Sequence, residues 1–316
     1  KMFRFEYNNS HFLKTKKNMK TFILNQLVTY QVILLFIIVS NGVFAQTEPL
    51  KITTPELEGI SSDSLALMNI HFKRLVDNKQ IAGIQTAIIR NNKLLHFNTY
   101  GYANIETEEK LNNQSIFRLF SMTKPIVSVA LMQLYEEGKF KLEDPLYKYL
   151  PEFKTMYTYI DGEKILAKRP IRVIDILRHT SGFGYGRGDN ESLNELYRNS
   201  GIWEATTNKA FAEILSKLPL TFEPGTDWHY GVSTNICGYL VEVLSGKSLE
   251  VYLNECILKP LEMNDTHFQL PKVKMNRFTV GYRWTNEALT VSETIEDNRY
   301  VREVTLFNGG GGLVST

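Results

Sequence analysis

Cysteine is nearly absent from this chain of 316 residues, which contains only Cys237 and Cys256. Two thiols cannot form the set of disulfides that holds many small secreted folds together, even in an oxidising compartment. Cys256 shares a helical stripe with Leu249, Tyr252 and Leu253, so we expect it to be a buried free thiol. The fold must then rely on a hydrophobic core, for which a chain with 43% hydrophobic residues has enough material.

A strong excess of charge of one sign is also missing, because the formal net charge is only +2. Residues 1–45 contain six of the 36 basic residues and one of the 34 acidic residues, which leaves 30 basic and 33 acidic residues in the rest, a net charge of −3. A surface with this balance offers no extended basic patch to a polyanion. We therefore expect no nucleic-acid partner.

No uninterrupted hydrophobic run is long enough to span a bilayer, which needs about 20 apolar residues. The most apolar stretch is centred on residues 32–39, after a short basic segment that starts at Met19 and before small residues that end at Ala45. This layout is typical of a secretory signal peptide, and a membrane anchor is the alternative. We expect residues 19–45 to direct secretion or export to the periplasm and to be cleaved after Ala45, so that no stable membrane span remains.

Metal-ligand spacings are missing among the six histidines. Gly246-Lys247-Ser248 resembles the end of a phosphate-binding loop, but Val241 stands where that motif requires glycine. We therefore expect a helix stop at Gly246, followed by the cap of the next helix. Neither a metal nor a cofactor is predicted.

The remaining sequence predicts one domain, residues 46–316, after upstream residues and a signal peptide in residues 1–45. No internal repeat or low-complexity linker interrupts it, so we expect one folding unit with two interleaved lobes. Apolar periodicity predicts helices at 61–79, 121–137, 173–177, 211–218, 236–244 and 249–258. Strands are expected at 83–90 and 94–102, joined in a hairpin by Asn91-Asn92-Lys93, and strand-like segments at 277–284 and 303–307.

The helix predicted at 121–137 begins with a serine and carries Pro125 in its first turn, where proline is tolerated. Gly138 is expected to end it. Its buried stripe is predicted to be Ile126, Val129, Ala130 and Leu134. Ser121 therefore lies at the amino end of this helix.

Ser121 and Lys124 lie three residues apart, so their side chains can meet on one helix face. A serine hydroxyl is a weak nucleophile until a neighbouring group takes its proton, and a lysine can take it or assist another base. At a helix amino end, the N–H of Ser121 could also stabilise the oxyanion formed when its own Oγ attacks a carbonyl. The spacing alone is weak evidence, since a solvated helix start gives the same pattern.

Tyr230 lies in a turn-rich stretch, residues 223–233, that leads into a helix. In such a loop, a tyrosine could face a pocket and move protons if a nearby cation favours its phenolate, although a packed aromatic is the alternative. We expect Ser233 to be the N-cap of the helix that follows, and His179 to cap another helix end. The glycines 309–312 are expected to make a tight turn from a strand to a helix.

Five blocks of this sequence resemble the serine β-lactamase-like hydrolases, the superfamily of class C β-lactamases, D-Ala-D-Ala carboxypeptidases and family VIII carboxylesterases. The blocks are FRLFSMTKPIVSVALMQLYEEGKFKLEDPLYKYLPEF at 117–153, IRVIDILRHTSGFGYG at 171–186, PGTDWHYGVSTNICGYLVEVLSGKSLEVYL at 224–253, LKPLEMNDTHF at 258–268 and GGGGLVST at 309–316. Several blocks in order are far more specific than one short motif. The resemblance implies an α+β fold in which an antiparallel sheet flanked by helices adjoins a mainly helical lobe.

The resemblance also implies roles for individual residues. Ser121 would be the acylated nucleophile, Lys124 its partner, and Tyr230 the general base that later protonates the leaving group. The pocket would accept a small ester or a peptide-like molecule.

Substrate-binding positions are expected beside this tyrosine at His229, Gly231 and Val232. Penicillin-acting relatives usually have an asparagine two residues after the tyrosine, where it contacts the substrate amide, whereas this chain has Val232. The loss of a polar contact favours esters over lactams and peptides.

The chain ends at Thr316, before the strand that in relatives carries a K-T-G or W-G-G sequence and supplies a second oxyanion N–H. Loss of one oxyanion donor typically costs about 10²–10³ in rate. We therefore expect this chain to be part of a longer protein and to lack the last strands of its sheet. Alone, it should be poorly soluble or inactive.

The predicted function is an exported serine hydrolase that forms an acyl-enzyme on Ser121 and acts on small esters. The alternative enzyme is a D-Ala-D-Ala peptidase, an amidase or a β-lactamase. A protein that binds cell-wall fragments without turnover is the alternative from another class. The oligomeric state is left open.

Overall fold

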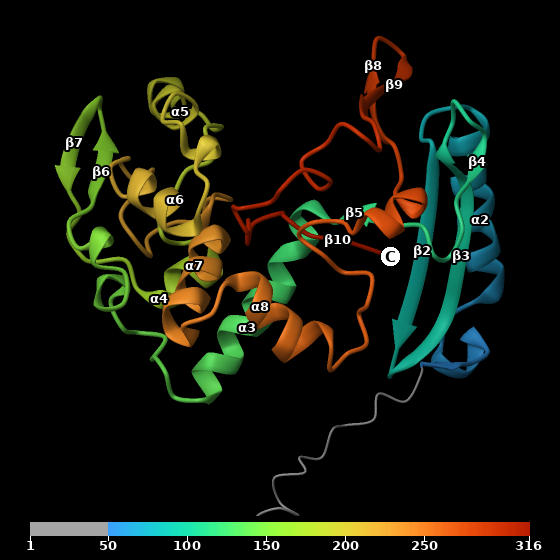
Figure 1. Ribbon diagram of the computed structural model, residues 1–316, viewed down its shortest axis with the longest axis horizontal. Coiled ribbons are helices and arrows are strands. Elements are labelled where there is room, and N and C mark those ends of the chain that lie inside the picture. Colours follow the sequence, from blue (N-terminus) through green and yellow to red (C-terminus); the bar gives the residue numbers. More distant parts are fainter. Residues whose placement is uncertain (1–49) are drawn as a thin grey trace, which may run out of the picture. The chain divides into compact units, whose positions relative to one another are not determined.

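The computed structural model describes residues 50–316, and Pro49–Thr316 forms one compact unit (Figure 1). The predicted signal peptide and the domain boundary after residue 45 lie outside the described residues. In the described part of the chain, no helix has the length and apolar character that crossing a membrane requires. The architecture combines a small sheet, a helical part and several two-stranded pairs, as the resemblance implies.

The sheet is built on the predicted hairpin. Strands β2 (Gly83–Arg90) and β3 (Lys93–Asn104) pair antiparallel. Asn91 and Asn92 connect them with φ angles of 51° and 56°, the left-handed conformations that a two-residue hairpin turn requires. β1 (Lys51–Ile52) pairs parallel with β3, and β4 (Glu109–Lys110) pairs antiparallel with it.

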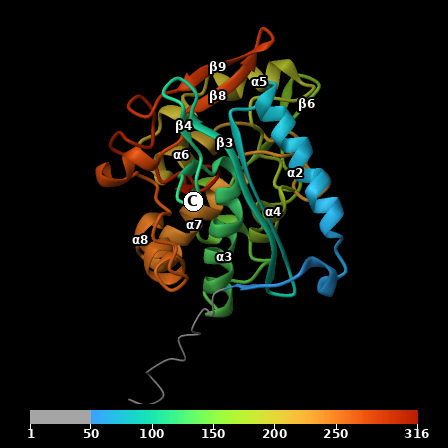
Figure 2. The ribbon, with the colours of Figure 1, turned by 90° about the vertical axis from the view of Figure 1, so that its right-hand side faces the viewer.

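Helix α2 (Ser62–Asp77) packs on β2 and β3, and Figure 2 views the sheet from the side that carries it. Its N-cap is Ser61, whose side chain accepts a hydrogen bond from the N–H of Ser64. The helix buries Leu65 and Val76. The expected amphipathic helix is therefore confirmed.

Helix α3 (Thr123–Glu136) follows a short 3-10 turn, η2 (Phe120–Met122). Its buried residues are Thr123, Val127, Ala130, Leu131 and Leu134. The prediction that Val129 belongs to this stripe is wrong, because its side chain is 52% exposed. Two residues along a helix turn a side chain by about 200°, so burial of Val127 directs Val129 to the opposite face.

The helical part has α7 (Ser233–Ser245) at its centre, where it contacts α3 and the helices on either side. These neighbours are α4 (Val173–Arg178), α6 (Asn208–Leu215) and α8 (Leu249–Leu253), which continues into a π-helix, η6 (Asn254–Leu258). α5 (Glu191–Arg198) lies further out (Figure 1). Short 3-10 helices occupy Pro55–Glu58, Leu146–Lys148, Pro151–Phe153, Ile202–Glu204 and Lys272–Arg277.

The helix stop predicted at Gly246 is confirmed, because Gly246 is the C-cap of α7 in the left-handed conformation, with φ 71°. Ser248 caps α8, since its side chain accepts a hydrogen bond from the N–H of Val251. A stop followed by a cap therefore explains this stretch.

Two further hairpins were not fully predicted. β6 (Tyr157–Ile160) and β7 (Glu163–Leu166) are joined by an Asp-Gly turn, a strong hairpin signal inside a segment expected to be helices and loops. β8 (Gly281–Thr285) and β9 (Ala288–Glu293) form another, so strand structure near 277–284 begins later than expected.

The strand predicted at 303–307 is absent, because side chains take its backbone groups. The N–H of Val304 donates to the side chain of Gln269 at 3.2 Å, and the carbonyl of Phe307 accepts from the side chain of Asn208 at 3.1 Å. Backbone groups satisfied in this way do not need a neighbouring strand.

The main hydrophobic core lies in the helical part, where buried residues of α3 and α7 meet. A second cluster consists of Ile116, Leu270, Phe278, Tyr300 and Val314. Cys237 is buried in the main core, whereas Cys256 is only half-buried, so the prediction of burial for Cys256 is wrong in degree.

The glycine run 309–312 makes a turn that leads into β10 (Val314–Ser315). β10 pairs antiparallel with β5 (Phe117–Arg118), just before the predicted nucleophile. The prediction of a turn from a strand to a helix is therefore wrong. Instead, the end of the described chain is tied to the segment that carries Ser121.

Candidate active site

Ser121 is exposed within η2, between β5 and α3. The preceding residue, Phe120, has φ 45°, a left-handed conformation that a bulky side chain rarely adopts. Strain of this kind costs on the order of 1–3 kcal/mol and is found preferentially at functional sites. The tight turn brings Ser121 to the surface just ahead of α3.

Ser121, Lys124 and Tyr230 converge, although 109 residues separate the serine from the tyrosine. Ser121 Oγ lies 2.6 Å from the Tyr230 hydroxyl, and Lys124 Nζ lies 3.3 Å from the same Oγ. Lys124 Nζ is also 4.7 Å from the centre of the Tyr230 ring and donates to the carbonyl of Gly310 at 2.7 Å. The three predicted catalytic side chains therefore form one hydrogen-bonded cluster.

The chemistry of these groups constrains which of them donates each hydrogen bond. A lysine ammonium only donates hydrogen bonds, and Lys124 donates both to Ser121 Oγ and to the Gly310 carbonyl. The proton of the serine hydroxyl is then free to point toward the Tyr230 oxygen. This arrangement is compatible with the predicted roles of Tyr230 as base and Lys124 as its supporting charge, which stay predictions.

The electrostatics favour this assignment. Partial burial by itself raises the pKa of the Tyr230 phenol, but the nearby Lys124 ammonium and the hydrogen bond with Ser121 outweigh it, so the pKa lies below its usual value of 10.0. Tyr230 is 39% exposed.

His179 supports Tyr230 from behind, a contact that the sequence did not predict. The two rings are stacked, with centroids 5.0 Å apart and planes 23° apart. His179 Nδ1 accepts a hydrogen bond of 3.3 Å from the N–H of Gly231. Burial, and then the charges of Lys124 and His229, lower the pKa of His179, which favours the neutral ring that this hydrogen bond requires.

The predicted role of His179 as a helix cap is confirmed, since it is the C-cap of α4 with φ 58°. A signal for this position was present in the sequence, because His179 lies in the block at 171–186 that resembles the family. There was none for the stacking, because that depends on how the loop of Tyr230 folds back onto α4.

The glycine loop supplies the carbonyl that holds Lys124. A side chain at Gly310 would place its Cβ only 2.3 Å from Asn235 Oδ1. Asn235 donates to Asn308 Oδ1 at 2.8 Å, and the same oxygen accepts from the N–H of Gly310 at 2.8 Å. Glycine is therefore needed here for space, so that the loop can pass close to α7.

The positions predicted to bind substrate lie beside Tyr230 in different environments. Val232 is the N-cap of α7 and is only 1% exposed. Gly231 is buried, and a Cβ on it would lie 1.9 Å from the carbonyl oxygen of Phe183. His229 is half-buried, and its Nε2 is buried with no hydrogen-bond partner in the described part of the chain. Their roles in substrate binding stay predictions.

Ser233 is not the N-cap of α7, as was predicted, but its first helical residue. Its buried hydroxyl forms a hydrogen bond of 2.9 Å with the hydroxyl of Ser181. The capping prediction fails because this neighbour occupies the side chain.

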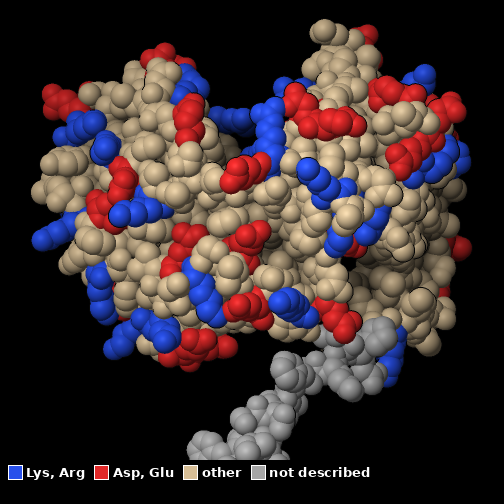
Figure 3. Space-filling view, in the orientation of Figure 1, with Lys and Arg blue, Asp and Glu red and all other residues tan. Residues whose placement is uncertain are grey.

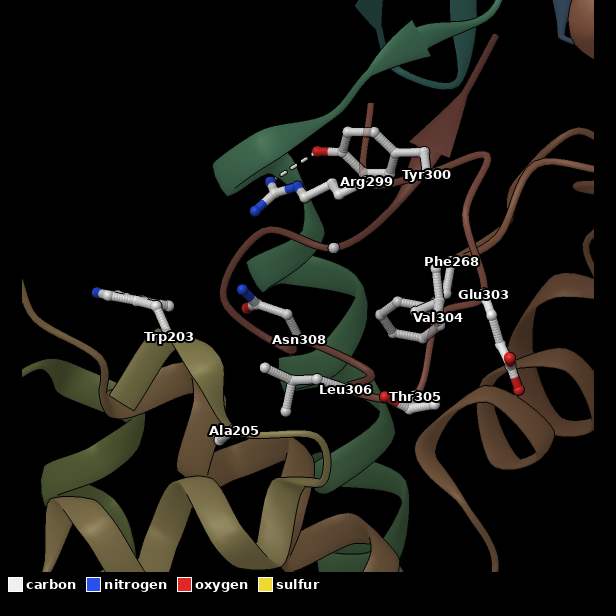
Figure 4. A pocket seen from close by; sticks show the side chains of 11 residues that line it. Trp203, Ala205, Phe268, Arg299, Tyr300, Glu303, Val304, Thr305, Leu306 and Asn308 are labelled. Carbon is white, nitrogen blue, oxygen red and sulfur yellow. Dashed lines mark hydrogen bonds between the residues drawn. The ribbon is translucent and has the colours of Figure 1, made fainter. Parts of the chain in front are cut away.

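Ser121 opens into a cavity of about 370 Å³. Its lining is Phe120, Ser121, Tyr185, Gly186, Arg187, Arg198, Trp203, Asn235, Arg299, Asn308, Gly310 and Gly311. A second cavity of about 340 Å³ shares Trp203, Arg299 and Asn308 with it, so the two adjoin. In the second cavity, Leu306 and Asn308 lie between Trp203 on one side and Phe268 on the other (Figure 4).

Among residues 50–316, no three His, Cys, Asp or Glu side chains are grouped so that they could hold a metal ion. The arrangement that is present suits nucleophilic attack on a carbonyl. It combines an exposed hydroxyl, a phenol with a lowered pKa and a nearby ammonium group.

Comparison with known proteins shows what this chain is similar to. The Beta-lactamase family model matches residues 68–316. Esterase EstB of Burkholderia gladioli is 28% identical over 234 residues, which cover 72% of this chain and 57% of EstB. A putative D-alanyl-D-alanine carboxypeptidase of Salmonella typhimurium is 28% identical over 239 residues, covering 72% of this chain and 53% of the relative.

A solved structure with a similar fold is that of simvastatin synthase (LovD) from Aspergillus terreus, with a TM-score of 0.68 and 25% sequence identity. The similarity covers 81% of this chain and 66% of LovD. The chain spans little more than half the length of the curated relatives it matches, which is 57% of EstB and 53% of the putative carboxypeptidase.

Proposed function

The chain belongs to the Beta-lactamase family, and on that basis we propose that it is an exported serine hydrolase that forms an acyl-enzyme on Ser121. The observation that carries the proposal is the distance of 2.6 Å between Ser121 Oγ and the hydroxyl of Tyr230, with Lys124 Nζ 3.3 Å from the same Oγ. This is the distance at which a base can take the proton of its nucleophile.

In the acylation step, the Tyr230 phenolate takes the proton of Ser121 while Oγ attacks the ester carbonyl. In this proposal, the N–H of Ser121, at the amino end of the helical segment, donates to the oxyanion that forms. When the bond between the carbonyl carbon and the leaving oxygen breaks, Tyr230 returns the proton to the departing alcohol.

In the second step, water attacks the acyl group on Ser121. Tyr230 takes a proton from this water and returns it to Oγ, so the carboxylic acid leaves and the enzyme is restored. Lys124 keeps its positive charge through both steps and stabilises the phenolate from 4.7 Å above its ring centre.

Small esters are the proposed substrates. Val232 offers an apolar side chain where a contact to a substrate amide would need a polar one, and it is buried. The similarity to an esterase supports the same choice.

Replacement of the nucleophile tests the proposal. We expect Ser121→Ala to abolish hydrolysis of a nitrophenyl ester and labelling by a fluorophosphonate probe, because no other described hydroxyl contacts Tyr230. A circular dichroism spectrum like that of the unaltered protein is the control for folding. Labelling retained in the variant would refute the assignment of Ser121.

A D-Ala-D-Ala peptidase is the second candidate, favoured by the similarity to putative carboxypeptidases. Relative values of kcat/KM for an ester, a D-Ala-D-Ala peptide and a cephalosporin decide between the candidates. An ester preference supports the first proposal, and a peptide or cephalosporin preference supports the second. Binding of a cell-wall fragment with no acylation would instead indicate a non-catalytic protein.

Export is proposed from residues 19–45, which have the layout of a signal peptide. Expression in a bacterial host followed by N-terminal sequencing should find a mature protein that starts at Gln46 in the exported fraction. An unprocessed amino terminus in the cytoplasmic fraction would contradict this.

A further inference from the structure

The charged side chains that line the cavity next to Ser121 are all positive. Three arginines, Arg187, Arg198 and Arg299, line it, and no Asp or Glu is among its lining residues. Figure 3 shows basic side chains in the hollow beside the β8–β9 hairpin. Like charges around one space repel one another unless an anion enters it.

Arg299 is held in position without a carboxylate. Its Nη2 donates to the carbonyl of Gly311 at 2.9 Å and to the hydroxyl of Tyr300 at 2.7 Å. Its guanidinium lies 4.8 Å from the centre of the Tyr300 ring and 5.9 Å from that of Phe120. Figure 4 shows the guanidinium beside Tyr300, at the boundary of the two adjoining cavities.

These contacts fix the guanidinium but do not neutralise it. Among residues 50–316, Arg299 forms no ion pair, and it donates hydrogen bonds through Nη2 but not through Nε or Nη1. Phe120 and Gly311 belong to the two segments that frame Ser121, so Arg299 is anchored to the site itself.

The other two arginines differ from each other. Arg198 is paired with Glu191 and donates to the carbonyl of Gly186 at 3.1 Å, so its charge is partly compensated. Arg187 has only a cation–π contact, with its guanidinium 5.8 Å from the centre of the Tyr185 ring, and no ion pair in the described part of the chain. The cavity therefore contains two guanidinium groups with no carboxylate partner.

We propose that the ester substrate carries a carboxylate, which Arg187 and Arg299 bind while Ser121 attacks the ester carbonyl. This inference rests on the proposed hydrolase function and names the substrate class of the same site. The guanidinium of Arg187 can match a carboxylate through two parallel N–H donors, whereas Arg299, whose Nη2 already donates twice, can add a charge-assisted hydrogen bond from Nε or Nη1. Arg187 and Arg299 thus determine specificity and take no part in the proton transfers.

Two pairs of esters test the inference. Mono-4-nitrophenyl glutarate and 4-nitrophenyl pentanoate differ in a carboxylate on the acyl side, and 4-acetoxybenzoate and its methyl ester differ in one on the leaving side. We expect the charged member of at least one pair to have a kcat/KM about 10-fold higher or more, which is the effect of a hydrogen bond between charged groups. The preference should shrink as the ionic strength rises.

Arginine variants locate the effect. We expect Arg299→Gln and Arg187→Gln each to lower the ratio of kcat/KM for charged over neutral ester by about 10-fold, and Arg299→Lys, which keeps the charge, to lower it less. Arg283→Gln is the matched control, since Arg283 is exposed in β8 and does not line the cavity. It should leave the ratio unchanged.

The outcomes separate this inference from the proposed function. If Ser121 hydrolyses the neutral esters but neither charged ester is preferred, or if the ratio survives both arginine variants, the inference is overturned and the hydrolase stands. If no ester is hydrolysed, both fail. A preference that Arg283→Gln removes equally would show general electrostatic attraction and would also overturn the assignment to the cavity.

Discussion

Lys124 touches three partners with one charge: the hydroxyl of Ser121, the carbonyl of Gly310 and the face of the Tyr230 ring. The carbonyl contact is the shortest and fixes the ammonium in place. Because that charge lies beside the phenol, it lowers the cost of forming a phenolate. In the proposed mechanism, the lysine acts mainly by lowering the pKa of the tyrosine.

The pH dependence of the reaction follows from this. The pKa of Tyr230 lies below 10.0, so its phenolate forms at a lower pH than that of an ordinary tyrosine. We expect kcat/KM to rise with pH with a midpoint below pH 10, and Lys124→Met to move this rise to higher pH. A pH–rate profile with a neutral ester measures both, and a rise that stays in place in the variant would contradict the role given to Lys124.

Removal of the phenol gives an independent measure of the base. General base catalysis contributes about 10²–10⁴ in rate, so Tyr230→Phe should lower kcat by a factor in that range and remove the rise with pH. The ring and its stacking on His179 are kept in this variant, which makes it a conservative change.

The site is assembled where η2 and α3, the loop before α7, and the glycine loop meet. Each element contributes one contact to Lys124: the hydroxyl of Ser121, the ring of Tyr230 and the carbonyl of Gly310. Packing of α3 against α7 sets the distance between the first two. The glycine loop then closes the third side.

Two neighbouring glycines provide a matched test of the loop. We expect Gly310→Ala to disrupt activity, because its Cβ would lie 2.3 Å from Asn235 Oδ1 and would push the loop away from Lys124. Gly311→Ala should be tolerated, since its Cβ would meet only ordinary contacts, the nearest at 3.4 Å from Phe120. Steady-state kinetics and melting temperatures of the two variants decide this, and equal losses would contradict the argument.

The sequence predicted elements well where one local pattern decides them. The i, i+3 spacing gave the contact between Ser121 and Lys124, and Asn91-Asn92 gave the first hairpin. It failed where distant groups compete, as for Val304 in the absent strand, whose N–H is taken by Gln269. The contact of Tyr230 with Ser121 lay beyond any local pattern, so only the family resemblance predicted it.

The molecule as a whole depends on the core between α3 and α7, since the same two helices carry the catalytic groups or their loops. Leu131 is fully buried on α3, and Val129 is 52% exposed on the same helix. Deletion of a buried leucine side chain typically costs about 2–5 kcal/mol, whereas surface changes stay within about 0.5 kcal/mol.

We therefore expect Leu131→Ala to lower the free energy of unfolding by about 2–5 kcal/mol and Val129→Ala to change it by less than about 0.5 kcal/mol. Urea denaturation followed by tryptophan fluorescence measures both. Similar values for the two variants would mean that the buried face of α3 is assigned incorrectly.

The positive charge of the cavity could not be predicted from the sequence. Arg187 and Arg299 lie 112 positions apart in the chain and in no recognisable motif, and the net charge of the chain is only +2. Their common location follows from the path of the segment before the glycine loop. The positive charge around Ser121 is therefore apparent only once the fold brings these arginines together.

The central claim is that Ser121 carries the acyl group during turnover. Acid quenching of the enzyme during hydrolysis of a 4-nitrophenyl ester, followed by peptide mass spectrometry, tests this most directly. We expect an added acyl mass on the peptide that contains Ser121, accumulating before steady state and absent from Ser121→Ala. An acyl group on another residue, or full turnover without any acylated peptide, would contradict it.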